Sequence, residues 1–234
     1  MTVTVTSLTK AAAAATAVAG AIFIAVQIGH PSTGSFTTET TQWVARSYAK
    51  SGMAALALVG ITGMYLRQYR KAGLLGLVGY LMFAAGYLAM LSVEVIAATV
   101  LPNLVDSEPG FVNDVVGAAA GATPNGDIGG LQTLFNVVGA GYILGGLLFG
   151  IALFRAGILA RWAAALLAVS TVATAALAVL PESFNRPLAV PEGIALIALG
   201  ISLWRNPRDS HQPTPATSSA NAMPVSPVEQ PAVR

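Results

Sequence analysis

Six long apolar runs constrain this chain more than any other feature of its sequence. They cover residues 11–29, 48–66, 72–101, 128–154, 161–180 and 188–204. A helix needs about 20 apolar residues to cross the roughly 30 Å of hydrocarbon in a bilayer, and each run is close to that length. None of the runs alternates with a period of two, and an unpaired strand could not satisfy its backbone in lipid. We therefore predict an all-α fold, a bundle of six transmembrane helices over residues 11–205.

The small number of charged residues excludes an ordinary soluble domain. Only 9% of the 234 residues are charged and 55% are hydrophobic, whereas about a quarter of a soluble chain is charged. The chain also has no cysteine, which excludes disulfides, thiolate metal sites, iron–sulfur clusters and a cysteine nucleophile. Most apolar residues must therefore lie against lipid or against one another.

The first run could in principle belong to a cleaved secretory signal, since Lys10 precedes it. Its apolar stretch continues to Ile28, which exceeds the usual signal-peptide core of about 7 to 15 residues. No small-residue cleavage pattern stands before Gly29, His30 and Pro31. We therefore expect the run to stay attached as the first transmembrane helix, preceded by a cytoplasmic segment of residues 1–10.

The distribution of Lys and Arg predicts the orientation of the bundle. Because six predicted helices alternate in direction, the two chain ends and every second turn lie on the same side of the bundle. Nine of the 12 Lys and Arg residues lie on that side: Lys10, Arg67, Arg70, Lys71, Arg155, Arg161, Arg205, Arg208 and Arg234. The opposite turns hold the other three, Arg46, Lys50 and Arg186, together with most acidic residues: Glu39, Asp106, Glu108, Asp114, Asp127 and Glu182. Because short cytoplasmic loops retain Lys and Arg, we predict that both termini are cytoplasmic and that the outer face is acidic.

Each outward-going run starts beside a cation and ends at a proline, which predicts three helical hairpins. The pairs are Lys10 with Pro31, Lys71 with Pro102, and Arg161 with Pro181. An internal repeat would produce this pattern, but topology alone would also place cations at inner ends and prolines at helix ends. Both interpretations stay open.

Glycines in two of the runs predict where helices pack closely. The run over residues 128–154 holds Gly141, Gly145, Gly146 and Gly150, and the run over residues 72–101 holds Gly73, Gly76, Gly79 and Gly86. Lipid tails are as apolar as side chains, so close backbone approach at small residues is what favours helix contact. We expect these two helices to be central and to pack within one chain. Homodimerisation through the same glycines is the alternative.

Two segments outside the apolar runs have patterns of their own. In the longest outer loop, residues 102–127, apolar residues recur at helical spacing: Phe111, Val112, Val115, Val116 and Ala119. This spacing predicts a short amphipathic helix that lies in the outer interface and caps the bundle. Residues 206–234 are rich in proline and polar residues, so we predict a disordered cytoplasmic tail.

Polar residues near the outer ends of the apolar runs form a candidate vestibule. The set is Gln27, His30, Glu94, Gln132, Asn136 and Glu192. Polar groups inside a membrane are costly and usually functional, so we expect the members from helices one, three, four and six to converge at one depth. Glu192 follows two prolines and should lie in the first turn of a short helix, turned inward towards amides or Arg186. The alternative is that these side chains simply meet water and lipid head groups.

Enzyme and cofactor signatures are absent from the sequence. It has no nucleophile elbow, zinc-protease motif, phosphate-binding loop or aspartate-rich diphosphate motif. His30 beside Pro31 is interpreted as closing a helix, because no second histidine or close carboxylate pair completes a metal site. We expect no catalytic residue, metal or cofactor and no nucleic acid. The expected partners are the lipid bilayer and either another protein or a second copy of the chain.

Two functions fit these observations. The missing motifs favour a non-catalytic scaffold or partner subunit, multi-pass in the cell membrane. The outer polar residues favour the alternative, a small-solute or proton-linked carrier with a polar outer vestibule. An intramembrane enzyme ranks third.

Three segments resemble a group of uncharacterised small polytopic membrane proteins of high-GC Gram-positive bacteria. They are residues 27–31, residues 60–65, and residues 150–155 followed by residues 161–164. The resemblance covers roughly residues 20–205 of the chain. It implies a six-helix integral membrane architecture in a bacterium, and it implies no activity, cofactor or functional residue.

Overall fold

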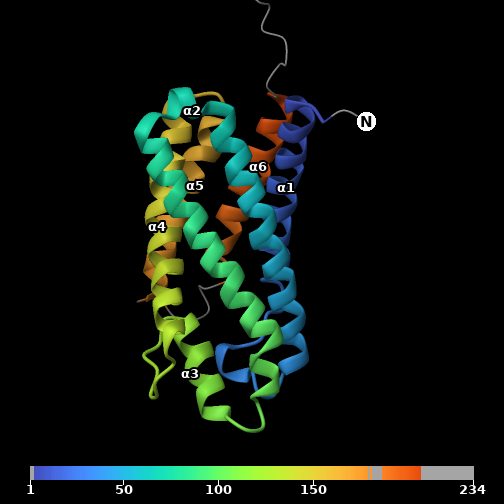
Figure 1. Ribbon diagram of the computed structural model, residues 1–234, viewed down its shortest axis with the longest axis vertical. Helices are drawn as coiled ribbons and strands as arrows, with labels where there is room; N and C mark the ends of the chain where they lie inside the picture. The colour runs from blue at the N-terminus through green and yellow to red at the C-terminus, as the bar shows by residue number, and fades with distance from the viewer. Residues whose placement is uncertain (1–2, 179, 181–185, 207–234) are drawn as a thin grey trace, which may run out of the picture.

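The computed structural model describes residues 3–178, 180 and 186–206, and every regular element in these ranges is a helix. The α-helices are α1 (Val5–Ala25), α2 (Thr40–Thr99), α3 (Pro109–Ala119), α4 (Gly130–Ala156), α5 (Arg161–Ala173) and α6 (Ala189–Arg205). Short 3-10 helices are η1 (Thr33–Ser35), η2 (Leu101–Asn103) and η3 (Thr174–Ala178). Apart from α3, the α-helices run along the long axis of the molecule (Figure 1). The all-α prediction is confirmed for the described residues.

Helix α2 is bent back on itself, so it supplies two antiparallel legs (Figure 1). The backbone leaves helical geometry at Gln68, with φ −136°, and at Gly73, with φ 59° and ψ −156°. A positive φ is strained for any residue with a Cβ, which explains a glycine at the second break. The two legs, residues 40–67 and 74–99, correspond to the predicted helices 48–66 and 72–101.

Several helices begin or end away from their predicted limits. Helix α1 starts at Val5 rather than 11, because Thr4 and Ser7 form a capping box: the Ser7 N–H donates to Thr4 Oγ1 at 3.1 Å and the Thr4 N–H to Ser7 Oγ at 3.0 Å. Residues 5–10 therefore extend the helix instead of forming a separate segment. The run predicted over 161–180 is α-helical only to Ala173. Most of the predicted tail, residues 207–234, lies outside the described residues. So do Pro181 and Glu182.

The long helices form a closed ring in which each packs against its neighbours in the sequence. Helix α1 packs against the first leg of α2, the second leg of α2 against α4, α4 against α5, and α5 against α6. The two legs of α2 are joined by the stacked rings of Tyr65 and Tyr80, 4.6 Å between centroids. Helix α6 closes the ring on α1. Large side chains, among them Phe83, Phe149 and Leu196, are fully buried.

Glycines bring neighbouring backbones into direct contact around this ring. A Cβ added to Gly145 would lie 2.3 Å from the Phe83 backbone nitrogen, and one on Gly79 would lie 2.5 Å from that of Phe149. Separations below about 3.0 Å require the backbones to move apart, so these contacts of α4 with α2 exist only because the side chain is a hydrogen atom. This packing within one chain agrees with the prediction from the glycine spacing.

A second hydrophobic core lies at the end of the molecule that holds α3 (Figure 1). Its buried members are Phe36, Leu101, Val112, Val115, Val116, Ala118 and Ile128. We call this end, residues 101–129 with Phe36, the cap. The predicted amphipathic helix is α3. The Asp114 carboxylate accepts hydrogen bonds from the backbone N–H groups of Asn125 and Gly126, which lower the pKa of Asp114 and hold the loop after α3 against it.

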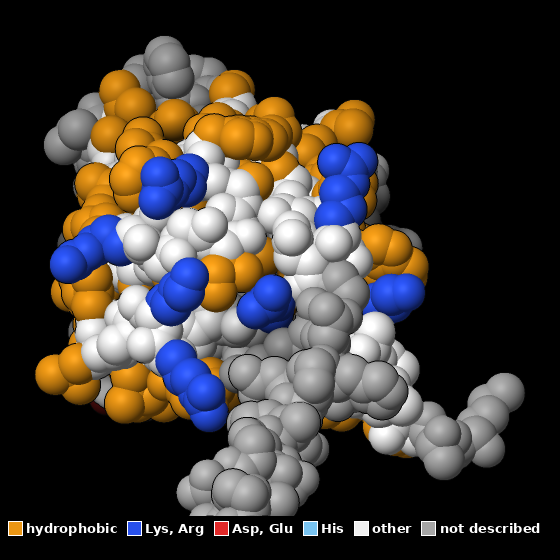
Figure 2. Space-filling model, turned by 90° about the horizontal axis from the view of Figure 1, so that it is seen from above, with side chains coloured by type: hydrophobic (Ala, Val, Ile, Leu, Met, Phe, Trp, Pro, Cys, Tyr) orange, Lys and Arg blue, Asp and Glu red, His pale blue; other side chains and the backbone are white. Residues whose placement is uncertain are grey.

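The opposite end of the molecule carries cations. Helix α1 begins there, α2 turns there, α4 connects to α5 there and α6 ends there (Figure 1). Seven Lys and Arg residues of the described ranges lie at these points: Lys10, Arg67, Arg70, Lys71, Arg155, Arg161 and Arg205. Figure 2, which views this end directly, shows Lys and Arg side chains distributed around it. The seven acidic residues described, Glu39, Glu94, Asp106, Glu108, Asp114, Asp127 and Glu192, all lie elsewhere.

Three of the helices are long and apolar enough to cross a membrane: Val5–Ala25, the α2 region Thr40–Asn103 with its two legs, and Gly130–Ala156. A shorter apolar helix covers Arg161–Ala176. Large hydrophobic side chains such as Leu74, Trp162 and Val169 are exposed on the outside of the ring. These features are those of a protein that associates with a membrane.

The glycine contacts can be tested by substitution with alanine. Gly145→Ala should destabilise the bundle by about 1 to 3 kcal/mol, since the new methyl group overpacks the backbone contact with α2. Gly139→Ala, in the same helix, is the matched control because nothing lies within 4 Å of its added Cβ. It should be neutral or stabilising by about 0.5 to 1 kcal/mol. Thermal unfolding in detergent micelles measures both, and equal effects would contradict the packing described.

Candidate functional site

A buried carboxylate lies in the interior of the ring. Glu192 is in the first turn of α6 and its side chain is fully buried. The positive end of the helix dipole favours an acid at this position. The predicted placement in the first turn of a short helix and the predicted inward direction both agree with the structure.

Two tyrosines from the other side of the ring bind this carboxylate. The Tyr87 hydroxyl, from the second leg of α2, donates to Glu192 Oε1 at 3.1 Å. The Tyr142 hydroxyl, from α4, donates to Glu192 Oε2. Tyr87 is fully buried and Tyr142 nearly so. We call Glu192, Tyr87 and Tyr142 the Glu192 cluster; its hydrogen bonds join α6 to the neighbouring pair formed by α4 and the second leg of α2.

Each member of the Glu192 cluster stands next to a glycine at a close helix contact. Gly86 precedes Tyr87 and Gly141 precedes Tyr142, and a Cβ on Gly86 would lie 2.8 Å from the Gly141 carbonyl carbon. Gly193 follows Glu192, and a Cβ there would lie 2.8 Å from the Gly20 carbonyl oxygen of α1. The close approach of the backbones therefore sets the position from which all three polar side chains reach the centre.

Aromatic rings cover the Glu192 cluster. The ring of Phe83 meets that of Tyr87 edge-on at 5.0 Å between centroids, and it lies 5.9 Å from the ring of Tyr142. Phe149 packs against Phe83 at 6.2 Å. Edge-on and tilted arrangements of this kind are the favoured ones for aromatic pairs. The carboxylate is therefore held in an apolar surrounding in which the two hydroxyl groups are its hydrogen-bond donors.

The chemistry open to this cluster is that of a single carboxyl group. A carboxylate with two phenol donors can hold and release a proton. Metal sites for hard cations normally combine several oxygen ligands, often more than one of them acidic. Among the described residues no group of three His, Cys, Asp or Glu side chains is placed to hold a metal ion.

The other vestibule residues make contacts of their own. Glu94 pairs with Lys50 at 3.5 Å, and the Gln27 amide oxygen accepts from Arg186 Nη1 at 3.4 Å. Gln132 donates to Asn136 at 3.3 Å. The six candidate residues are thus distributed over separate contacts, and the side-chain hydrogen bonds of Glu192 within the described residues go to tyrosines outside the set. The expected amide or Arg186 partner of Glu192 is wrong; the partners are tyrosines.

His30 lies just beyond the C-terminal end of α1, near Lys50, Arg46 and Arg186. Its Nδ1–H donates to the Pro31 carbonyl at 2.9 Å, its ring packs edge-on against Trp43 at 4.8 Å, and its Nε2 is buried without a partner. Burial, followed by the charge of Lys50 and smaller contributions from Arg186 and Arg46, lowers the pKa of His30 to about 4. The imidazole is therefore neutral at pH 7. His30 does not close α1 as expected, because the helix ends at Ala25 with Val26 as its C-cap.

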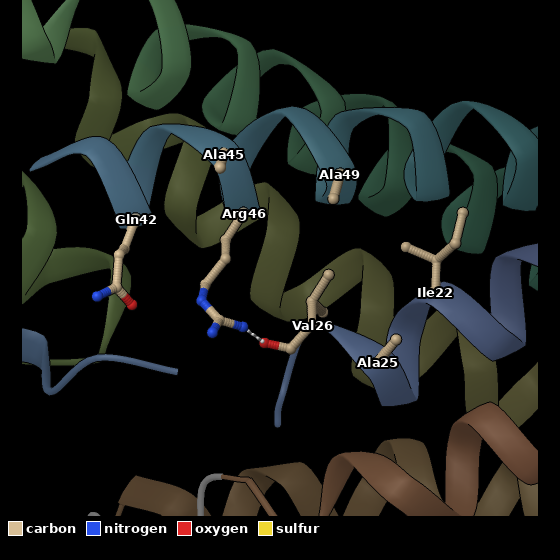
Figure 3. Close-up of a pocket in the computed structure, with 7 residues that line it drawn as sticks. All are labelled: Ile22, Ala25, Val26, Gln42, Ala45, Arg46 and Ala49. Atoms are coloured by element: carbon tan, nitrogen blue, oxygen red, sulfur yellow. Dashed lines mark hydrogen bonds between the residues drawn. The ribbon is translucent and has the colours of Figure 1, made fainter. Parts of the chain in front are cut away.

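Two hollows of the described surface lie apart from the Glu192 cluster. One is a groove of about 460 Å³ between the end of α1 and the start of α2 (Figure 3). The second, of about 310 Å³, lies between α1 and α6 at the opposite end and is lined in part by Ala13, Gly200 and Trp204. Neither is lined by a member of the Glu192 cluster.

No protein-family model matches this chain, and neither a curated protein nor a solved structure is significantly similar to it. Function has to be inferred from the geometry of the chain itself.

The pairing in the Glu192 cluster predicts a specific order of stability. Glu192→Gln should stay within about 1 kcal/mol of wild type, since the amide can still pair with the tyrosines, whereas Glu192→Leu should lose about 1 to 3 kcal/mol because two buried hydroxyls lose their acceptor. Adding Tyr87→Phe and Tyr142→Phe to Glu192→Leu should restore most of that loss. Thermal unfolding in detergent measures the series. A triple variant no more stable than Glu192→Leu would contradict the pairing.

Proposed function

We propose that this chain is a multi-pass protein of the cell membrane with six transmembrane helices in three hairpins and both termini in the cytoplasm. The long helices α1 and α4 and the two legs of α2 supply four crossings. Helix α6 has 17 residues, and at 1.5 Å per residue it is about 25 Å long, close to the hydrocarbon thickness. Helix α5 with η3 completes the set. The resemblance to small polytopic bacterial membrane proteins supports the same architecture.

The charge distribution supports this orientation. The seven described cations at the end where α1 begins would face the cytoplasm, and the cap would face outwards. Aromatic residues Trp162 and Trp204 lie at the cation-rich end, where an aromatic belt is expected.

Within that membrane placement, we propose that the protein is a non-catalytic scaffold or partner subunit. The observation that carries this proposal is the cap, which has a hydrophobic core of its own on a glycine-packed ring. A folded cap is a surface of fixed shape, and Asp106, Glu108 and Asp127 are exposed on it. An acidic surface of this kind is complementary to a protein partner with a basic docking face. It would repel the equally acidic cap of a second copy of the chain.

A proton-linked carrier is the second candidate, and the Glu192 cluster is the observation that favours it. A fully buried acid in a membrane bundle is functional by default, and carriers place ion sites near helix starts in the bundle. In the conformation described, aromatic rings and glycine contacts enclose the carboxylate. A carrier would have to open this packing to reach Glu192, whereas a scaffold would keep it closed.

Cysteine labelling tests the orientation, and the absence of native cysteine makes the chain suitable for it. Glu108→Cys, on the cap, should react with a membrane-impermeant maleimide in intact cells. Arg70→Cys, at the turn of α2, should react only after the membrane is permeabilised. Both side chains are exposed, so access to the reagent differs only by the side of the membrane. Labelling of Arg70→Cys from outside would overturn the proposed orientation.

One pair of measurements separates scaffold from carrier. A photo-crosslinking residue at the exposed position Ser107 should give one crosslinked product of defined mass in native membranes. Reversing the charges with Asp106→Lys and Glu108→Lys should remove that product without changing thermal stability, since a basic partner face would now be repelled. Proteoliposomes of wild type and Glu192→Gln should pass protons no faster than empty liposomes. Proton flux that is present in wild type and lost in Glu192→Gln would instead establish the carrier.

A further inference from the structure

The groove between α1 and α2 is polar at one end and apolar along the rest of its length. Ile22, Ala25 and Val26 line it from α1, and Gln42, Ala45, Arg46 and Ala49 line it from α2 (Figure 3). Gln42 and Arg46 are one helical turn apart and both extend from α2 towards the end of α1 (Figure 3). They lie on the side nearer the start of α2, and the apolar lining continues along the surface towards Ala49 and Ile22 (Figure 3).

This direction of polarity matches that of a lipid in the outer leaflet. With the membrane placement proposed above, on which this inference rests, the start of α2 faces the outer head groups and Ala49 and Ile22 lie deeper. The groove volume of about 460 Å³ falls within the range of small-molecule sites, about 300 to 1,000 Å³. Two alanines on one side of it leave room that larger side chains would fill.

The guanidinium of Arg46 is held in place with donors to spare. Its Nη1 donates to the Val26 carbonyl at 2.8 Å and its Nη2 to the Gly29 carbonyl at 2.7 Å. These bonds satisfy carbonyls at the end of α1. A guanidinium has five N–H donors in a fixed plane, so three remain for an additional acceptor. Planar donors of this kind suit the oxygens of a phosphate.

The cations of the outer end gather beside this groove. Lys50 lies one turn beyond Arg46 on α2, and Arg186 donates to the Pro31 carbonyl at 3.2 Å just after the end of α1. Lys50 pairs with Glu94 at 3.5 Å. Arg46 is the cation that lines the groove itself, so the polar end of the groove is complementary to an anion.

We propose that this groove binds one phospholipid of the outer leaflet, with an acyl chain against its apolar walls and the phosphate on Arg46. The Gln42 amide is placed to donate to ester or glycerol oxygens next to the phosphate. The bound lipid would link the ends of α1 and α2 below the cap.

Lipid titration of the purified, delipidated full-length protein tests this proposal by native mass spectrometry. Wild type should bind dioleoyl phosphatidylglycerol at least about fivefold more tightly than dioleoylglycerol, which has the same chains and no phosphate. Arg46→Gln should remove this preference. Arg155→Gln is the matched control, because it removes an exposed arginine at the opposite end, and it should leave both affinities unchanged.

A second variant keeps the test independent of the role of Arg46 at the end of α1. Ala45→Leu leaves all charges in place and fills the groove. It should therefore lower the affinity for both lipids by at least about threefold while circular dichroism shows an intact fold. Equal binding of the two lipids by wild type would overturn the proposal. So would displacement by inorganic phosphate at equal affinity, which would indicate a site for free anions. Cysteine labelling from the opposite side would overturn only the membrane placement, since phospholipid binding is measured in detergent.

Discussion

Helix backbones in this chain meet at glycines, and the rest of the structure depends on that contact. Between apolar helices in lipid there is no gain from excluding water, so dispersion contacts at short range have to hold the ring together. The contact of Gly145 with the backbone of Phe83 and that of Gly150 with the backbone of Ala164 are of this kind. Such contacts leave little lateral freedom, and the ring is therefore narrow enough for side chains on opposite helices to touch.

The Glu192 cluster is a consequence of this narrowness. A tyrosine hydroxyl inside an apolar helix needs a hydrogen-bond partner, and so does a buried carboxylate. Because Gly86 and Gly141 bring α2 and α4 together and Gly193 brings α6 onto α1, the three polar side chains meet in the middle. The carboxylate accepts hydrogen bonds from both tyrosine hydroxyls, so each polar group has a partner. The polar cluster and the glycine contacts are thus one arrangement, in which loosening a helix contact would also separate a hydrogen-bonded pair.

The sequence predicts the helices and the inward direction of Glu192 because both follow from local patterns. Apolar run length identifies the helices, and the cost of a charge in lipid turns the acid inward. The tyrosine partners could not be predicted in the same way, since Tyr87 lies 105 residues from Glu192 along the chain. The adjacent glycines were the available signal: a tyrosine beside a close-contact glycine is held at the ring interior. The early start of α1 depended on a capping box at Thr4, outside the apolar run.

The three cations at the outer end do not weaken the proposed orientation. The orientation follows from the larger number of Lys and Arg at the opposite end, and these three are each held by other groups of the chain. Arg46 and Arg186 donate to carbonyls at the end of α1, where the helix dipole is negative, and Lys50 pairs with Glu94. At the opposite end Lys10 lies over Trp204 and Arg161 over Phe154, with no ion pair among the described residues there. Arg67 at that end also donates to a carbonyl, that of Asn206, at 2.7 Å. Cations are therefore engaged at both ends, and the difference in their number is what favours placing the cation-rich end in the cytoplasm.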